Sequence, residues 1–226
     1  MQRFASEGAH ANLAWAAVLG LAGALATIAF REGIAGLQWL LVPRSGGLVE
    51  TARGLPWWER LLLPVGGGIY AGLILQCSRR LGANAASDYM EAIAIGDGRI
   101  GVGQSLARSA SSLCSIVSGG SIGREGSMVQ LAAMAASVLG RMTLLSPPRL
   151  RLFVACGAAA GITAAYNAPI AGALFVAEIV LGSIAMDSFG PLLVAAVVSN
   201  VTMRRAGGGT ERVNIGAMGL SKYLLK

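Results

Sequence analysis

Charged residues are scarce in this sequence. Lys, Arg, Asp and Glu make up 13% of the 226 residues, whereas apolar residues make up 54%. Soluble domains carry about 25% charged residues, and the mean hydropathy of this chain is correspondingly high, at +0.63. These values exclude an ordinary soluble domain and indicate a membrane protein.

The sequence is also poor in the residues that build metal sites and catalytic centres. His10 is the single histidine, and the three cysteines, Cys77, Cys114 and Cys156, stand apart in apolar runs without a C-x-x-C spacing. Neither a metal site nor a disulfide framework is indicated, and we expect the cysteines to be small buried packing residues. No Ser-His-Asp or Cys-His set can be assembled, so the sequence predicts no enzyme.

A phosphate-binding loop is absent too. Residues 96–101, GDGRIG, fit the G-x-G-x-x-G pattern, but that pattern requires a preceding strand and an acid about 20 residues further on. The preceding residues, SDYMEAIAI, instead predict a short helix with Ser87 or Asp88 as N-cap and Gly96 as its C-terminal stop. We therefore predict a connecting loop at 96–101 and expect no nucleotide or other cofactor.

What the sequence does contain is apolar runs of two kinds. Residues 12–30, 61–77 and 185–203 suit membrane-spanning helices, which need about 20 mostly apolar residues. The chain is predicted to be an all-α polytopic membrane protein with short, broken and re-entrant helices, and its first run a retained helix rather than a cleaved signal peptide. The shorter runs, broken by glycine or charge, are 83–95, 104–118, 126–140, 150–165 and 168–182.

Small and basic residues fit the same class of protein. We expect most of the 32 glycines, Gly68 and Gly72 among them, to be packing points where membrane helices approach closely. The net charge of +7 comes from basic residues in connectors, which is typical of loop ends at anionic lipid rather than of nucleic-acid binding. Those residues are Arg79, Arg80, Arg141, Arg149, Arg151, Arg204 and Arg205.

Two adjacent charges interrupt the apolar stretch 118–140, SGGSIGREGSMVQLAAMAASVLG. Its glycines predict irregular backbone, followed by a helix of about four turns that begins between Gly123 and Ser127. A helix start binds anions through free N–H groups and its positive dipole end, and Glu125 is an anion fixed at that start, able to take an ion's place. Two other interpretations stay open: Arg124 and Glu125 form a buried structural pair, or Glu125 only caps the helix.

Two further stretches combine polar residues with half-helices, as membrane ion sites do. Asn84 stands among alanines, and Ser87 begins a short helix whose N-terminus could point at an ion. The charge of Asp88 opposes an anion there unless that side chain caps the helix. Residues 156–182 are broken at 167–169, where a proline suits the first turn of the second segment.

In this order the stretches resemble the CLC family of chloride channels and proton/chloride antiporters. GREGS at 123–127 matches the family's GREGP, and AAGITAAYNAPIAGALFVAE at 159–178 matches the signature that follows it. NAASDYMEAI at 84–93 resembles a divergent bacterial branch. For residues 1–203 the resemblance implies the first of two inverted repeats of a multi-pass homodimer in the bacterial inner membrane, with one anion pathway in each subunit.

The resemblance also implies roles for individual residues. Glu125 corresponds to the gating glutamate. Asn84 falls at the position of the serine that contacts the central ion, and Ser87 is the alternative donor. The outer anion site is implied to be lined by the backbone N–H groups of Gly123, Arg124, Gly126, Ser127 and Met128. Chloride is then the expected ligand, with no cofactor and no metal.

Three departures from the family pattern limit this carry-over. Ile179 follows Glu178 at the position of the antiporters' internal proton-transfer glutamate, which favours passive conduction over proton antiport. Ser127 replaces the proline of GREGP and is expected to alter anion preference. The second repeat, with its G-x-F-x-P motif, is not among the 226 residues, and 204–226 is predicted to be a polar connector and truncated tail.

Other classes of function therefore compete with an autonomous voltage-gated-type chloride channel. The sequence is interpreted as the N-terminal half of a transporter, and whether it conducts alone stays open. The alternative is a truncated, non-conducting membrane scaffold or a half-transporter that needs a second-repeat partner. A membrane enzyme that uses a redox cofactor or a nucleotide is a third class. That class would show a bound cofactor in its absorbance spectrum.

Overall fold

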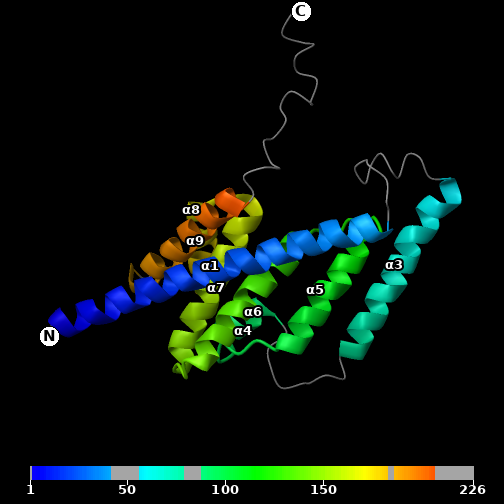
Figure 1. Ribbon diagram of the computed structural model, residues 1–226. Coiled ribbons are helices and arrows are strands. Elements are labelled where there is room, and N and C mark those ends of the chain that lie inside the picture. Colours follow the sequence, from blue (N-terminus) through cyan, green and yellow to red (C-terminus); the bar gives the residue numbers. More distant parts are fainter. Residues whose placement is uncertain (1, 42–55, 79–87, 183–185, 207–226) are drawn as a thin grey trace, which may run out of the picture.

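The computed structural model describes residues 2–41, 56–78, 88–182 and 186–206, and every regular element in these ranges is a helix (Figure 1). The prediction of an all-α fold with short and broken helices is confirmed. In chain order the helices are α1 (Gln2–Leu41), α3 (Trp57–Ser78), α4 (Tyr89–Ala94), α5 (Val102–Val117), α6 (Glu125–Met142), α7 (Pro147–Tyr166), α8 (Pro169–Phe175), the π-helical turn η1 (Val176–Val180) and α9 (Met186–Ala206).

Among the described helices, α1 and α3 are long and apolar enough to cross a membrane. Their qualifying segments are Ala11–Trp39 and Trp57–Ser78, which contain two of the three long runs predicted from sequence. The third run, 185–203, forms α9, which has the length of a span but does not reach the same apolar level. Helix α9 ends at Ala206, and residues 207–226 of the predicted connector and tail lie outside the described residues.

The core is centred on α6 and α7, with α1 and α9 packed against α7 (Figure 1). Small residues let the two central helices touch. A Cβ on Gly157 would lie 2.7 Å from the carbonyl oxygen of Ala132, and a Cβ on Gly161 would lie 2.8 Å from the Cα of Val129. The prediction that glycines serve as packing points is confirmed at these positions.

Helices α3 and α5 lie side by side at one end of the molecule (Figure 1). The Ser111 hydroxyl donates to the carbonyl of Ala71 at 3.1 Å, which joins the two helices. The packing role predicted for Gly68 and Gly72 is wrong, because a Cβ on either would have no atom within 4 Å. Both glycines border open space instead.

The cysteines do not behave as one group. Cys156 on α7 is buried, as predicted, and Cys114 on α5 is partly buried. Cys77 is exposed, so the expectation of a buried packing residue is wrong there. The physical reason is that α3 packs chiefly against α5, which leaves most of its surface uncovered by the described helices.

The predicted break at 167–169 is present between α7 and α8. Asn167 ends α7 in the left-handed conformation, with φ of 56°, and its N–H donates to the Thr163 carbonyl at 2.7 Å. Pro169 then begins α8, where its missing N–H is not needed. The Asn200 amide of α9 donates to the Asn167 side chain at 2.6 Å and fixes this corner. After Pro169, α8 passes into the π-helical turn η1.

Candidate functional site

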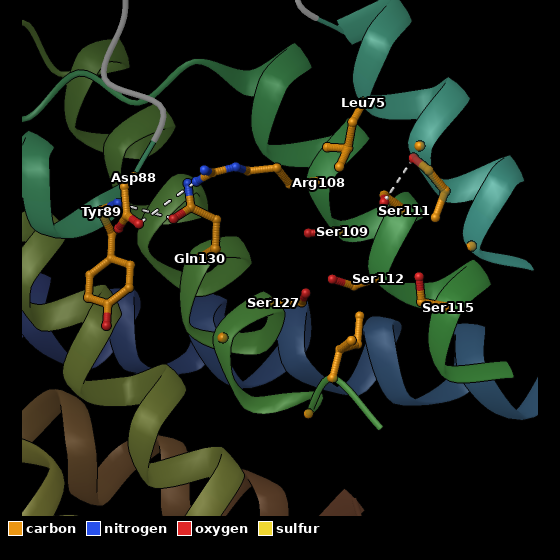
Figure 2. A pocket seen from close by; sticks show the side chains of 16 residues that line it. Leu75, Asp88, Tyr89, Arg108, Ser109, Ser111, Ser112, Ser115, Ser127 and Gln130 are labelled. Carbon is orange, nitrogen blue, oxygen red and sulfur yellow. Dashed lines mark hydrogen bonds and ion pairs between the residues drawn. The ribbon is translucent and has the colours of Figure 1, made fainter. Parts of the chain in front are cut away.

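A cavity of about 580 Å³ lies between α3, α5 and the starts of α4 and α6 (Figure 2). Its wall combines glycines of α3, a row of serines on α5 and residues from the starts of α4 and α6. Three of the site residues predicted from sequence, Gly123, Gly126 and Ser127, line it. Most of the described lining residues are small or carry hydroxyl groups, and Asp88 and Arg108 are the charged residues among them.

The chain reaches this cavity through a glycine turn at the end of α5. Gly119 has a φ of 96°, which favours glycine. Its N–H donates to the Ile116 carbonyl at 3.1 Å, and the N–H of Gly120 donates to the Ser115 carbonyl at 2.8 Å. This pair of bonds is a Schellman motif, which ends α5 and turns the backbone toward α6.

Helix α6 starts at the cavity without a cap. Gly123, with φ of 76°, precedes the N-cap residue Arg124, and no side chain accepts a hydrogen bond from the first turn. The first bond of the helix runs from the N–H of Met128 to the Arg124 carbonyl at 3.2 Å. The N–H groups of residues 125–127 precede it, and within the described residues they have no partner.

Glu125 is the first residue of α6, where the sequence predicted a helix start. It is partly exposed, and Arg124 is exposed. Its Oε2 lies 2.8 Å from the point that a Cβ on Gly123 would occupy, so the carboxylate folds back against the glycine that lines the cavity. Within the described residues, Arg124 and Glu125 form no buried pair, and the side chain of the N-cap residue Arg124 makes no capping hydrogen bond. The role of Glu125 itself stays a prediction.

The remaining predicted site residues fall into two groups. Met128 is 2% exposed and packs with Phe30 and Leu131, and its N–H is already engaged by Arg124. Met128 therefore presents no free donor. Asn84 and Ser87 lie outside the described residues.

The start of α4 also faces the cavity, but side chains close it (Figure 2). Asp88 is the N-cap, and its Oδ1 accepts a hydrogen bond from the N–H of Met90 at 3.0 Å. The Asp88 carboxylate also lies 3.8 Å from the Arg108 guanidinium. Asp88 therefore caps α4, as the sequence allowed, while its carboxylate still lines the cavity and is opposed there by Arg108.

Gln130 is a residue of this site that sequence reasoning missed. It is 5% exposed, its Oε1 accepts a hydrogen bond from the N–H of Tyr89 at 3.0 Å, and its Nε2 donates to Ser105 Oγ at 2.9 Å. One amide thus joins α4, α5 and α6. The available signal was a polar side chain within the otherwise apolar run 126–140, which in a membrane segment marks a position that needs partners.

The pair Glu178 and Ile179 lies elsewhere, on η1. Both side chains are exposed and neither lines the cavity. Across the described ranges, no three or more His, Cys, Asp or Glu residues gather closely enough to hold a metal ion.

Comparison with known proteins gives one consistent family. A family model described as voltage gated chloride channel matches residues 66–224. A protein described as ClcB-like from Ralstonia nicotianae is 60% identical over 198 residues, covering 85% of this chain and 46% of the relative. The voltage-gated ClC-type chloride channel ClcB of Yersinia pestis is 46% identical over 198 residues, covering 86% of this chain and 48% of the relative. The voltage-gated ClC-type chloride channel ClcB of Salmonella typhi is 44% identical over 191 residues, covering 83% of this chain and 45% of the relative. The chain spans about half the length of the curated relatives it matches.

Proposed function

We propose that this chain, which belongs to the voltage gated chloride channel family, moves small anions across a membrane, chloride foremost. The observation that carries the proposal is the open start of α6, where the free N–H groups include those of Gly126 and Ser127, two residues that line the cavity. Such donors bind an anion without a full positive charge, so the ion can also leave. Gly123, Arg124, Gly126 and Ser127 supply the backbone of this site.

Glu125 is the gate in this proposal. Its carboxylate lies against Gly123, close to where an anion would meet the free N–H groups. A carboxylate and a chloride ion compete for the same donors, so an ionised Glu125 blocks the path and its protonation or displacement clears it. Asn84 and Ser87 are proposed as donors to a central ion further along the path.

Passive conduction fits the chain better than proton antiport. Ile179 stands where the antiporters' internal glutamate is expected, and isoleucine carries no proton. Glu178 beside it is exposed on η1 and does not line the cavity. We therefore propose that chloride moves without obligatory proton exchange, and that the chain is not an enzyme and needs no cofactor.

The test is chloride release from liposomes that contain the purified full chain, with a pH-sensitive dye inside. Glu125→Gln imitates the protonated gate. Charge-assisted hydrogen bonds contribute about 1.5–3 kcal/mol each, and every 1.4 kcal/mol corresponds to roughly a tenfold change. We expect Glu125→Gln to raise chloride release at pH 7 by roughly tenfold, with no proton movement coupled to chloride.

The matched control is Glu32→Gln, which neutralises an exposed glutamate on α1 and should leave chloride release unchanged. Equal release from Glu125→Gln and the unmodified chain would remove Glu125 from the gating role. Proton movement in fixed proportion to chloride would contradict passive conduction.

A second candidate is a membrane scaffold or a half-transporter that works only with a second-repeat partner. It is favoured by the outward face of α3, where large apolar side chains such as Leu61, Ile69 and Leu73 are exposed and need lipid or another chain to cover them. No chloride release from well-folded protein would favour this candidate. We also propose that the protein is a homodimer in a bacterial inner membrane, with residues 1–203 as the transport unit. The molecular mass in detergent tests the homodimer directly.

A further inference from the structure

The hydroxyl of Ser109, in the cavity wall, lacks a hydrogen-bond partner among the described residues, whereas the hydroxyls of Ser105 and Ser111 on the same helix have one. Ser109 on α5 is 4% exposed and lines the cavity. Within the described residues, its Oγ has no hydrogen-bond partner. Buried polar groups in folded proteins are almost always hydrogen-bonded, so this exception calls for an explanation such as an ion or a water molecule.

The neighbouring serines of α5 show what engaged hydroxyls do. Ser105 Oγ accepts a hydrogen bond from Gln130 Nε2 at 2.9 Å, which ties α5 to α6. Ser111 Oγ donates to the Ala71 carbonyl at 3.1 Å, which ties α5 to α3. Ser109 stands between them in sequence and makes no such tie. Its burial is therefore not explained by a hydrogen bond between helices.

Two more hydroxyls belong to the same part of the wall. Ser112 on α5 and Ser127 in the first turn of α6 line the same cavity, and Figure 2 labels both beside Ser109 in projection. Ser112 stands three residues after Ser109, so the two lie on one face of α5. Each hydroxyl has one proton to donate and can turn it toward a ligand. Hydroxyl donors from two helices thus line one cavity.

The charges around the cavity favour an anion at this place. Asp88 is the acidic residue of the wall, but its carboxylate accepts the N–H of Met90 and faces Arg108 at 3.8 Å. That negative charge is opposed at the α4 end of the cavity. The positive end of the α6 dipole acts at the end where Ser127 lies.

The cavity has room for water molecules beside a small ion. A water molecule takes up about 30 Å³ of liquid volume, whereas the cavity measures about 580 Å³. The space therefore admits a small ion together with several water molecules. An anion here keeps part of its hydration shell and receives the serine hydroxyls as its fixed ligands.

We propose that Ser109, Ser112 and Ser127 form a second anion site, on the α5 side of the cavity, for a small monovalent anion such as chloride. Its ligands are side-chain hydroxyls, which distinguishes it from the backbone N–H groups beside Glu125. The inference rests on the proposed function only for the identity of the ion. On the conduction path, this second site would hold an anion next to Glu125.

The experiment measures equilibrium binding rather than transport. Chloride is titrated calorimetrically into the purified full chain in detergent, in a chloride-free gluconate buffer. A hydrogen bond to a charged ligand changes affinity by roughly tenfold or more. We expect Ser109→Ala to weaken chloride binding about tenfold by the same reasoning, and Ser109→Cys, of similar size but a weaker donor, to fall between.

The matched control is Ser111→Ala, on the same helix and at the same cavity, whose hydroxyl is already engaged by Ala71. It should bind chloride as the unmodified chain does. Unchanged chloride affinity in folded Ser109→Ala overturns the proposal and indicates that the Ser109 hydroxyl binds a water molecule instead. If Ser109→Ala does not fold, unchanged affinity in Ser109→Cys overturns it in the same way.

Binding and transport separate this inference from the proposed function. Chloride binding that depends on Ser109, without release of chloride from liposomes, supports the site and contradicts autonomous conduction. Chloride release without any dependence of binding on Ser109 supports conduction and contradicts the site.

Discussion

Helices α4 and α6 begin at the same cavity, but side chains close the first start and leave the second open. At α4, Asp88 accepts the N–H of Met90 and Gln130 accepts the N–H of Tyr89, each at 3.0 Å. At α6, the N-cap side chain makes no capping hydrogen bond, and the described residues supply no acceptor for the N–H groups of residues 125–127. The free donors of the cavity are therefore concentrated at α6, beside Glu125.

The cause of this difference is local backbone geometry. A capping side chain requires an extended N-cap residue, and Asp88 has φ of −128° and ψ of 143°. Arg124 follows the left-handed Gly123 and has φ of −95° and ψ of −14°, which is helical. The side chain that completes the closure of α4 comes from α6 itself, since Gln130 lies in its second turn. Helix α6 thus leaves its own first N–H groups free, while its Gln130 side chain engages the N–H of Tyr89 at the start of α4.

The largest expected effect comes from removing Gln130. Gln130→Leu breaks the hydrogen bonds to Tyr89 and Ser105, and leaving buried groups unpaired costs about 1–3 kcal/mol each. We expect the free energy of unfolding to fall by about 2–4 kcal/mol in denaturant titrations in detergent. Tyr89 lines the cavity and its N–H would lose its acceptor, so we expect chloride to stabilise this variant more than the unmodified chain.

The matched control for that variant is Ser105→Ala. It removes only the acceptor of the Gln130 Nε2 and leaves the bond to Tyr89 in place. We expect a loss of about 1 kcal/mol and no additional stabilisation by chloride. Equal chloride effects in both variants would contradict the claim that Gln130 withdraws a donor from the cavity.

The second effect in size comes from the glycine before the open start. Gly123→Ala places a side chain at φ of 76°, where the left-handed conformation costs roughly 1–2 kcal/mol. The new methyl would also lie 2.8 Å from the Glu125 Oε2 and displace the carboxylate. We expect a loss of about 1–2 kcal/mol in the free energy of unfolding, together with faster chloride release from liposomes.

Gly126→Ala is the control at the other glycine of this turn. Gly126 is helical, and a Cβ there would have no atom within 4 Å. Alanine stabilises a helix by roughly 0.5–1 kcal/mol relative to glycine, so this variant should gain stability. A similar loss in both variants would mean that the left-handed conformation of Gly123 does not decide the outcome.

The helix starts, breaks and caps that could be predicted from the sequence depend on signals from nearby residues. The start of α6 follows from the glycines around Glu125, the break after α7 from Asn167 and Pro169, and the cap of α4 from Asp88. Each of these depends on residues within one or two turns of each other. Such signals give the helices and place the candidate gate at a helix start, while the gating role itself stays a prediction.

Contacts between distant residues explain what could not be predicted. Gln130 closes the start of α4 across 41 positions, and no local pattern contains that pairing. Gly68 and Gly72 have the spacing of packing glycines, yet they border the cavity, because the neighbour of α3 lies on another side of the helix. The cavity is a product of how α3, α5 and α6 meet, so Ser109 could not be recognised as part of it.

A smaller effect is expected from removing the cap of α4. Asp88→Ala costs about 1 kcal/mol, the usual value of an N-cap side chain, since the half-exposed contact with Arg108 adds little. It also removes a negative charge from the cavity wall, which should strengthen chloride binding roughly twofold. Denaturant titration and calorimetry measure the two effects separately.

Asp88→Asn separates the two effects within one side chain. Asparagine caps helices as well as aspartate does, so stability should be retained while chloride binding still strengthens. Stability lost equally in Asp88→Asn and Asp88→Ala would show that the charge, rather than the cap, holds the start of α4.

The smallest effect on stability is expected from an attempt to close α6 in the way that α4 is closed. Arg124→Asp puts a good capping residue at the N-cap, which would add about 1 kcal/mol if it capped. Because the backbone of residue 124 is helical rather than extended, we expect a change within about 0.5 kcal/mol. Chloride binding should nevertheless weaken, because a negative charge replaces a positive one beside the free N–H groups, and Arg124→Ala should weaken it by a smaller factor. A clear gain in stability for Arg124→Asp would mean that α6 can be capped, and that its open start reflects the residue at 124 rather than the turn imposed by Gly123.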